Sequence, residues 1–526
     1  MNNLKPFLFL FIAAVFYTIG FPNIFSIQVP FLSIVGTSVL LHYIFQERSF
    51  KKQFVYYLYF NLIITIISFY WITQTLQDFG NLPFIVAAIM NSLYSFILNP
   101  QYWLLIFLLF YIRKKHKALE EKYFINGIFS ILLAFFLTTT EYFIPQQFPV
   151  MLGQPWIIFG EHLGLASILG LPAFSFFSYL LAIELKRLKD FSKLNILFIS
   201  LFAITNLILT SSKESDKYQD LNVRMVQANI SNFLKIESEN TFASSTSVIK
   251  KYRDLSVLPF KNKQKIDLII WPETAYPYPL DTSKNNFKNT YVPAVFKSIN
   301  YKMGAEIVFG GYDHFRNDPE FPYFKTDYNS AIHLDKNGII KDIYHKHILI
   351  PFGETLPLGP LNKHISQYLP EVAFFMEGQN FPIQKLENEI KFISTICYEI
   401  LRPEFIRKYL NNVDSTPDIL INLTNDSWYG NTVEPEQHLF LSRWRAIEFN
   451  IPILRSTNTG ITTYINSHGM EEDRLNYNTT ANLDLTVRVS RDRKITIFQR
   501  FGFTIMLPIL LLLFLFHILL LKLKND

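Results

Sequence analysis

Long apolar segments separated by short polar loops fill residues 1–211, and one more segment follows near the end of the chain. A helix needs about 20 apolar residues to cross a bilayer. Asn99-Pro100-Gln101 interrupts the longest segment, so we expect a kink or a break there. The pattern predicts eight transmembrane helices, at 5–22, 24–45, 54–72, 82–112, 123–144, 164–185, 194–211 and 501–521.

Between the last two of these segments the pattern changes. Short β-branched runs alternate with helical stretches over residues 212–500, which is typical of a layered α/β domain with covered sheets. The strands are expected at 222–230, 266–273, 305–313, 328–335, 338–346, 389–399, 417–426 and 453–465, and the helices near 241–256, 288–302, 401–410 and 435–449. The chain therefore divides into a membrane domain of seven helices (1–211), an α/β domain (212–500), and a final transmembrane helix with its tail (501–526).

Composition and charge agree with a membrane protein. Hydrophobic residues make up 50% of the chain and charged residues 17%, a balance too apolar for an ordinary soluble protein. The loops on one side hold Arg48, Lys51, Lys52, Arg113, Lys114, Lys115, Lys117, Lys122, Lys186, Arg187, Lys189 and Lys193, whereas those near 22–24, 73–81 and 145–163 contain no Lys or Arg. The positive-inside rule places both termini in the cytoplasm and residues 212–500 outside it. The net charge of +6 thus reflects topology, and we do not interpret it as nucleic-acid binding.

Candidate chemistry centres on Cys397, the only cysteine in the sequence. Three acid–base positions, Glu273, Lys346 and Cys397, each end a predicted strand, where sites of α/β domains are usually assembled. A thiol needs a base or a positive neighbour to act as a nucleophile. Each residue also has an ordinary explanation: a buried core thiol, a carboxylate at a helix start, a solvated lysine. Spacing alone does not decide between the two.

Three sequence segments favour the catalytic interpretation of these residues. "WPETA" (271–275), "YHKHILIPFGE" (344–354) and "CYE" (397–399) resemble the signature motifs of the apolipoprotein N-acyltransferases, a membrane branch of the nitrilase superfamily. The resemblance extends over the whole chain in order and layout, and implies a nitrilase-like α/β/β/α sandwich on a base of eight helices. It departs at Ile236, where the family commonly has Trp, and in the loop 145–163, which lacks the usual basic residue and "GFPW".

The resemblance also implies roles for individual residues. Glu273 would be the general base, Lys346 the cation that stabilises an oxyanion, and Cys397 the nucleophile. The supporting residues would be Glu354, Asn329, Tyr398 and Glu399, and the residues expected to line the substrate are Trp428, Tyr429, Phe374 and Phe375. Core packing is an equally good interpretation of Trp428 and Tyr429. The segment 355–382 is long and contains "VAFFM", so we expect it to act as a lid whose phenylalanines face the bilayer. Packing of Phe374 and Phe375 in a local core is an equally good interpretation.

The implied reaction is an acyl transfer in two steps. An acyl chain passes from a phospholipid to Cys397 as a thioester, and then to the amino group of a diacylglyceryl-cysteine at the start of a lipoprotein precursor. It needs no metal or organic cofactor, and the enzyme would lie in the bacterial inner membrane. Two alternatives remain: a membrane-tethered nitrilase or amidase that uses water as acceptor, and a receptor or transporter with an exported binding domain. The second predicts ionisable residues inside several spans. It ranks well below the others because few are found, with Glu141, His42 and His517 as near candidates.

Overall fold

The computed structural model describes residues 4–78, 80–115, 127–146, 148–187, 192–209, 217–261, 264–282, 290–314, 327–351, 353–368 and 372–525. Parts of the predicted basic loops, at 116–126 and 188–191, lie outside the described residues. The chain forms two compact units. A helical unit comprises Met1–Lys213, Thr432–Phe449 and Thr496–Asp526, and a sheet unit comprises Glu214–Asn431 and Asn450–Ile495.

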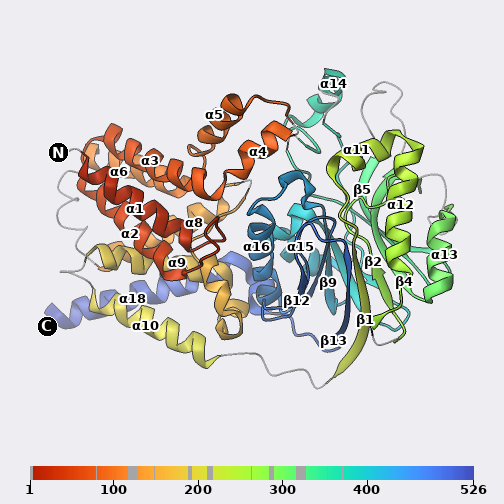
Figure 1. Cartoon of the computed structure of the whole chain (residues 1–526). Helices are drawn as coiled ribbons and strands as arrows, with labels where there is room; N and C mark the ends of the chain where they lie inside the picture. Colours follow the sequence, from red (N-terminus) through yellow and green to blue (C-terminus); the bar gives the residue numbers. More distant parts are fainter. Residues whose placement is uncertain are drawn as a thin grey trace. The chain divides into compact units, whose positions relative to one another are not determined.

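The helical unit is built from apolar helices, and α1 packs against α2 and α3 (Figure 1). The break expected within 82–112 is confirmed, because one helix ends at Tyr94 and the next begins at Pro100. The described helices are α1 (Lys5–Ile19), α2 (Pro30–Gln46), α3 (Phe50–Ser68), α4 (Trp71–Asp78), α5 (Phe84–Tyr94), α6 (Pro100–Lys115), α8 (Gly127–Phe143), η1 (Gln154–His162), α9 (Ala166–Lys186), α10 (Lys193–Ile208), α16 (Glu434–Phe449), α17 (Ile497–Phe501), η8 (Gly502–Ile505) and α18 (Met506–Asn525).

Helix length and composition indicate which of these helices could cross a membrane. Among the described residues, Ala166–Lys186 and Ile497–Phe516 are long and apolar enough to cross a membrane. Phe50–Ser68 and Trp71–Asp78 meet at a bend of 64° and would add a third span if they act as one. Five further apolar helices have 10–17 residues. Two to three spans, where eight are expected, therefore meet the length criterion.

Helix α16 belongs to the helical unit, although its sequence lies within the segment 212–500 predicted to be a separate domain. Its apolar and aromatic side chains explain this placement: the Trp444 indole is buried and donates a hydrogen bond to the Gln154 carbonyl at 3.0 Å. The Glu448 carboxylate accepts the backbone N–H of Leu171 at 2.9 Å, just after α9 breaks at Gly170 (φ +67°). The helix thus supplies a hydrogen-bond partner that the break in α9 requires.

The sheet unit contains two sheets that face each other, with β1 against β10 and β5 against β8. The described strands form one sheet of seven, ordered β13-β1-β2-β4-β5-β6 with β3 beside β4, and one of six, ordered β12-β11-β10-β9-β8-β7. The strands are β1 (Tyr218–Gln227), β2 (Leu268–Ile270), β3 (Pro279–Asp281), β4 (Glu306–His314), β5 (Asp327–Leu334), β6 (Ile340–His345), β7 (Gln384–Lys385), β8 (Lys391–Ile396), β9 (Ile419–Thr424), β10 (Ile453–Thr457), β11 (Thr462–Ile465), β12 (Glu471–Leu475) and β13 (Ala481–Ser490). All the predicted strands are present, and the last of them, 453–465, divides into β10 and β11.

The central strands β8, β9 and β10 run parallel to one another. Every residue of β9 and β10, and nearly all of β8, is buried. Strands covered on both faces need not alternate apolar and polar residues, and "FISTI" and "ILINL" show no such alternation. The remaining helical elements of the unit are α11 (Asn232–Asn240), α12 (Phe242–Ser256), α13 (Ala294–Met303), η4 (Gly359–Leu361), α14 (Asn362–Ile365), η5 (Ser366–Tyr368), η6 (Cys397–Leu401), α15 (Pro403–Asn412) and η7 (Asp426–Tyr429).

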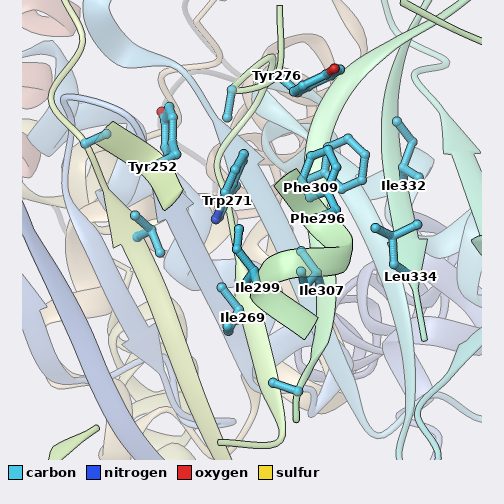
Figure 2. Close-up of a cluster of buried hydrophobic side chains, with 14 of the residues drawn as sticks. Tyr252, Ile269, Trp271, Tyr276, Phe296, Ile299, Ile307, Phe309, Ile332 and Leu334 are labelled. Carbon is cyan, nitrogen blue, oxygen red and sulfur yellow. The ribbon is translucent and has the colours of Figure 1, made fainter. Parts of the chain in front are cut away.

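A buried cluster joins helices α12 and α13 to the outer face of the seven-stranded sheet (Figure 2). Trp271 lies at its centre, stacked on Tyr252 with ring centroids 4.9 Å apart and close to Phe296 at 5.0 Å. Phe296 stacks in turn on Phe309 at 4.1 Å. One helix layer over two packed sheets agrees with the sandwich expected from the resemblance, and the cluster fixes the strand end that carries Glu273.

This packing predicts opposite outcomes for two positions on helix α13. Replacing Phe296 with Ala removes a fully buried ring and should cost about 3–5 kcal/mol of stability. Tyr301 is 93% exposed, so Tyr301→Ala should leave stability nearly unchanged. Denaturant unfolding of the sheet unit in detergent measures both. Equal losses for the two variants would contradict the assigned core.

Candidate active site

Three strand ends position the predicted acid–base residues. Glu273 follows β2, Lys346 follows β6 and Cys397 follows β8. All three side chains are buried, with 6%, 0% and 5% of their surface exposed. The structure brings them together: the Lys346 ammonium donates to Glu273 Oε1 at 3.2 Å, and both residues act electrostatically on the Cys397 thiol.

A second carboxylate completes the pairing of Lys346. Glu354 Oε1 accepts from the ammonium at 2.8 Å, while Glu354 Oε2 accepts the backbone N–H of Ile350 at 2.9 Å. Asn329 lies between the carboxylates and donates to Glu273 Oε1 at 2.8 Å and to Glu354 Oε1 at 3.0 Å. Glu354 and Asn329, two of the four predicted supporting residues, therefore hold Glu273 and Lys346 in one hydrogen-bonded group.

Charge and burial set the protonation of this group. Burial opposes the charge on Lys346, but the nearby Glu273 and Glu354 carboxylates outweigh it and raise the pKa of the ammonium. Burial and then the Glu273 carboxylate raise the pKa of the Cys397 thiol, against the opposing effect of Lys346. The resting thiol is therefore neutral at physiological pH. It needs a base during attack, and Glu273 is adjacent to provide one.

Cys397 is the first residue of η6 and lies at a sharp turn directly after β8. Its φ is +51°, in the left-handed region that non-glycine residues rarely adopt. Such a conformation persists only where the surroundings enforce it, and it concentrates at functional sites. The turn ends the strand abruptly, so the side chain leaves the line of β8.

Glu399 enforces this turn and connects it to the lysine. Its Oε2 accepts the Ile396 backbone N–H and the Tyr344 hydroxyl, each at 2.7 Å. Its Oε1 accepts the backbone N–H groups of His347 at 2.6 Å and Ile348 at 3.1 Å, directly after Lys346. One buried carboxylate thus joins the segment that carries the cation to the segment that carries the thiol.

The other predicted residues lie at varied positions. Tyr398 is buried and bonds Arg402 through its hydroxyl. Trp428 is 40% exposed, so the core-packing interpretation is wrong for it, and Tyr429 is half-buried. Phe375 stacks on Tyr312 at 5.7 Å. A role in lining the substrate stays a prediction for these aromatic residues.

Phe374 differs from the expected bilayer-facing position. Only 2% of it is exposed, and its φ is +51°. Its neighbours explain the inward direction: the Ala373 N–H donates to the Gly353 carbonyl at 3.0 Å, and the Phe375 N–H to the Glu354 carbonyl at 2.9 Å. These bonds fasten the segment to the loop that carries Glu354. The segment therefore lies against the acid–base group, with Phe374 turned inward.

Two hydrogen bonds at the site could not be predicted from the motifs. The Asn425 backbone N–H donates to Glu273 Oε2 at 2.9 Å, and Lys235 donates to the hydroxyl of Thr274, whose φ is +46°. No sequence signal distinguishes a backbone donor such as Asn425. Burial lowers the pKa of His347 to about 4, so this neighbour of Lys346 is neutral and adds no positive charge.

Comparison with known proteins identifies the family. A model of the apolipoprotein N-acyltransferase N-terminal domain matches residues 13–183, and the carbon-nitrogen hydrolase model matches residues 222–494. The chain belongs to the apolipoprotein N-acyltransferases within the carbon-nitrogen hydrolases. This family is a group of bacterial membrane enzymes.

Proteins named apolipoprotein N-acyltransferase match this chain along most of their length. An apolipoprotein N-acyltransferase of Bdellovibrio bacteriovorus is 29% identical over 452 residues, which cover 81% of this chain and 78% of the relative. One of Rickettsia typhi is 28% identical over 384 residues, covering 70% and 72%. Among solved structures, Nit3 of Saccharomyces cerevisiae, a member of branch 10 of the nitrilase superfamily, is 15% identical with a TM-score of 0.36, covering 54% of this chain and 94% of its own.

Gly310 on β4 gives a test of how closely the base is held. A Cβ at this position would collide with the Pro272 carbonyl oxygen and lie 2.6 Å from Glu273 Cα, whereas at Gly311 the nearest atom is 3.4 Å away. Gly310→Ala should therefore displace Glu273 and slow acyl transfer by roughly 10- to 100-fold. Gly311→Ala is the matched control and should keep the rate. Equal rates for the two variants would show that Glu273 does not depend on this contact.

Proposed function

We propose that this acyltransferase moves an acyl chain from a phospholipid to the N-terminal amino group of a diacylglyceryl-cysteine lipoprotein precursor, through a thioester on Cys397. The observation that carries the proposal is the buried group of Glu273, Lys346 and Glu354 beside the Cys397 turn. Family membership favours acyl transfer over hydrolysis of a C–N bond and over a receptor or transporter.

The first step forms the thioester. Glu273 accepts the thiol proton as the sulfur attacks the ester carbonyl, and Lys346 donates to the oxyanion that develops on the carbonyl oxygen. The C–O bond then breaks, and the proton on Glu273 passes to the departing lysophospholipid oxygen. Every proton is conserved, and the enzyme now carries the acyl chain on Cys397.

The second step releases the acyl chain as an amide. The neutral amino group of the lipoprotein precursor attacks the thioester carbonyl, and Lys346 stabilises the same oxyanion position. Glu273 accepts a proton from the attacking nitrogen and returns one to the departing sulfur. The free thiol and the ionised base are restored, so the same residues serve both halves of the reaction.

A membrane setting fits both substrates, because each is anchored in the bilayer by acyl chains. We propose that the chain crosses the inner membrane eight times with both termini in the cytoplasm, and that the catalytic domain lies on the outer side. The positive-inside distribution of Lys and Arg supports this topology. The apolar helices of the helical unit are consistent with it.

Cys397→Ser tests the covalent intermediate. Wild-type protein incubated with phospholipid should gain the mass of one acyl chain on the peptide that contains Cys397. The serine variant should gain none and transfer none, because a hydroxyl is far less acidic than a thiol. Mass spectrometry of the digested protein gives both results. Normal transfer by the variant would exclude the thioester route, and release of free fatty acid in the presence of the lipoprotein would indicate hydrolysis instead.

Topology is tested by labelling intact cells in a Cys397→Ser background. Tyr301→Cys places a thiol at a 93% exposed position of the sheet unit and should react with a membrane-impermeant reagent. Ser49→Cys, between α2 and α3, should react only after the cells are permeabilised. The opposite labelling pattern would place the catalytic domain in the cytoplasm.

A further inference from the structure

Arg455 on β10 is a fully buried cation that the proposed reaction does not use. Its Nη1 donates to the Asn422 side-chain oxygen at 2.8 Å, and its Nη2 donates to Asp426 Oδ2 at 3.0 Å. The guanidinium is a planar fork, so these two bonds fix the spacing of their acceptors. Arg455 therefore determines the shape of the chain where β9 ends, residues 422–426; Asn422–Thr424 close the strand, Asn425 and Asp426 leave it, and we call this segment the turn 422–426.

This turn reaches both partners of the first chemical step. The Asn422 side chain donates to the carbonyl oxygen of Cys397 at 3.5 Å, at the residue whose backbone is in the left-handed region. At the other end of the turn, the Asn425 backbone N–H donates to Glu273 Oε2 at 2.9 Å. One short segment thus contacts the nucleophile and the base, which lie 124 residues apart in the sequence (273 and 397).

The surroundings are shaped to hold the ion pair. Both Arg455 and Asp426 have no exposed side-chain surface. Gly460 leaves room for the carboxylate, because a Cβ there would collide with Asp426 Oδ2. A buried ion pair seldom stabilises a fold more than apolar side chains of the same volume. Fixed geometry at the turn is therefore a better explanation of this pair than stability.

We propose that Arg455 is a positioning residue for acyl transfer, which sets the placement of Glu273 relative to Cys397 by fixing the turn 422–426. The inference rests on the proposed roles of those two residues. A displacement of about 1 Å at the reacting groups can slow an enzyme by roughly 100-fold without weakening substrate binding. Loss of the fork should therefore lower the rate of the chemical step and leave KM for phospholipid unchanged.

Arg455→Lys is the direct test, since lysine keeps the charge and loses the fork. Arg224→Lys is its matched control. Arg224 is buried in the same unit and donates to Asp484 through Nε and Nη2, each at 2.7 Å. Its other described hydrogen-bond acceptors are backbone carbonyls at 255–259, and its guanidinium lies over the Phe260 ring. The full-length protein in detergent is mixed with phospholipid, and thioester formation is followed at several substrate concentrations together with the unfolding temperature.

The expected result separates position from stability. Arg455→Lys should form the thioester at least ~10-fold more slowly at saturating phospholipid with KM unchanged, while Arg224→Lys stays within about twofold at a comparable unfolding temperature. Arg455→Lys at the wild-type rate, or equal slowing of both variants, would overturn the inference. Failure of the wild-type protein to form any thioester would instead overturn the proposed function, and this inference with it.

Asn422→Ala gives a second measurement if Arg455→Lys does not fold. It removes the donor to the Cys397 carbonyl together with the acceptor of Arg455. The same slow thioester formation with unchanged KM is expected. Thioester formation at the wild-type rate in folded Asn422→Ala would overturn the inference.

Discussion

The ammonium of Lys346 has no contact with solvent, and its pairing with two carboxylates constrains the rest of the active site. An isolated buried charge is strongly unfavourable, and removing one partner of a buried ion pair costs about 3–5 kcal/mol. Glu273 and Glu354 must therefore both remain close to Lys346 for the fold to accept the charge. The requirement that stabilises the lysine also keeps the proposed base, Glu273, beside the proposed oxyanion-stabilising cation, Lys346.

The same charge balance determines how the thiol is activated. Burial raises the pKa of the Cys397 thiol, and the nearby Glu273 carboxylate raises it further against the opposing effect of Lys346, so the thiol stays protonated at rest. Glu399 then connects the lysine segment to the nucleophile turn. Burial raises the pKa of Glu399 to about 7, against the backbone hydrogen bonds that favour its ionised form.

The sequence anticipated the elements with strong local signals. Short β-branched runs predicted β8, β9 and β10, and Asn99-Pro100-Gln101 predicted the break between α5 and α6. It missed β13, because that strand pairs with β1 from the far end of the domain and has only a partly buried pattern of its own. Helix α16 packs in the helical unit for a similar reason: its contacts are with helices remote in sequence, so its own pattern does not reveal them.

The candidate site shows the same division. Motifs brought out Glu273, Lys346, Glu354 and Cys397, which the structure gathers into one group. Motif reading gave no account of the Asn425 N–H on the base, 152 residues from Glu273. The prediction that Phe374 faces the bilayer is also wrong, because hydrogen bonds from the loop carrying Glu354 turn this segment inward. Backbone donors and side-chain direction depend on tertiary contacts, which no local pattern records.

We propose that Cys397 is a neutral thiol at rest and depends on Glu273 for its activation. The pH dependence of its alkylation by a small uncharged reagent tests this directly, because the protein contains no other cysteine. An unperturbed thiol titrates near pH 8.5. A neutral resting thiol predicts slow alkylation at neutral pH and an alkylation rate that is still rising above about pH 9. Fast alkylation that reaches a plateau below about pH 7 would show a resting thiolate and contradict a neutral Cys397.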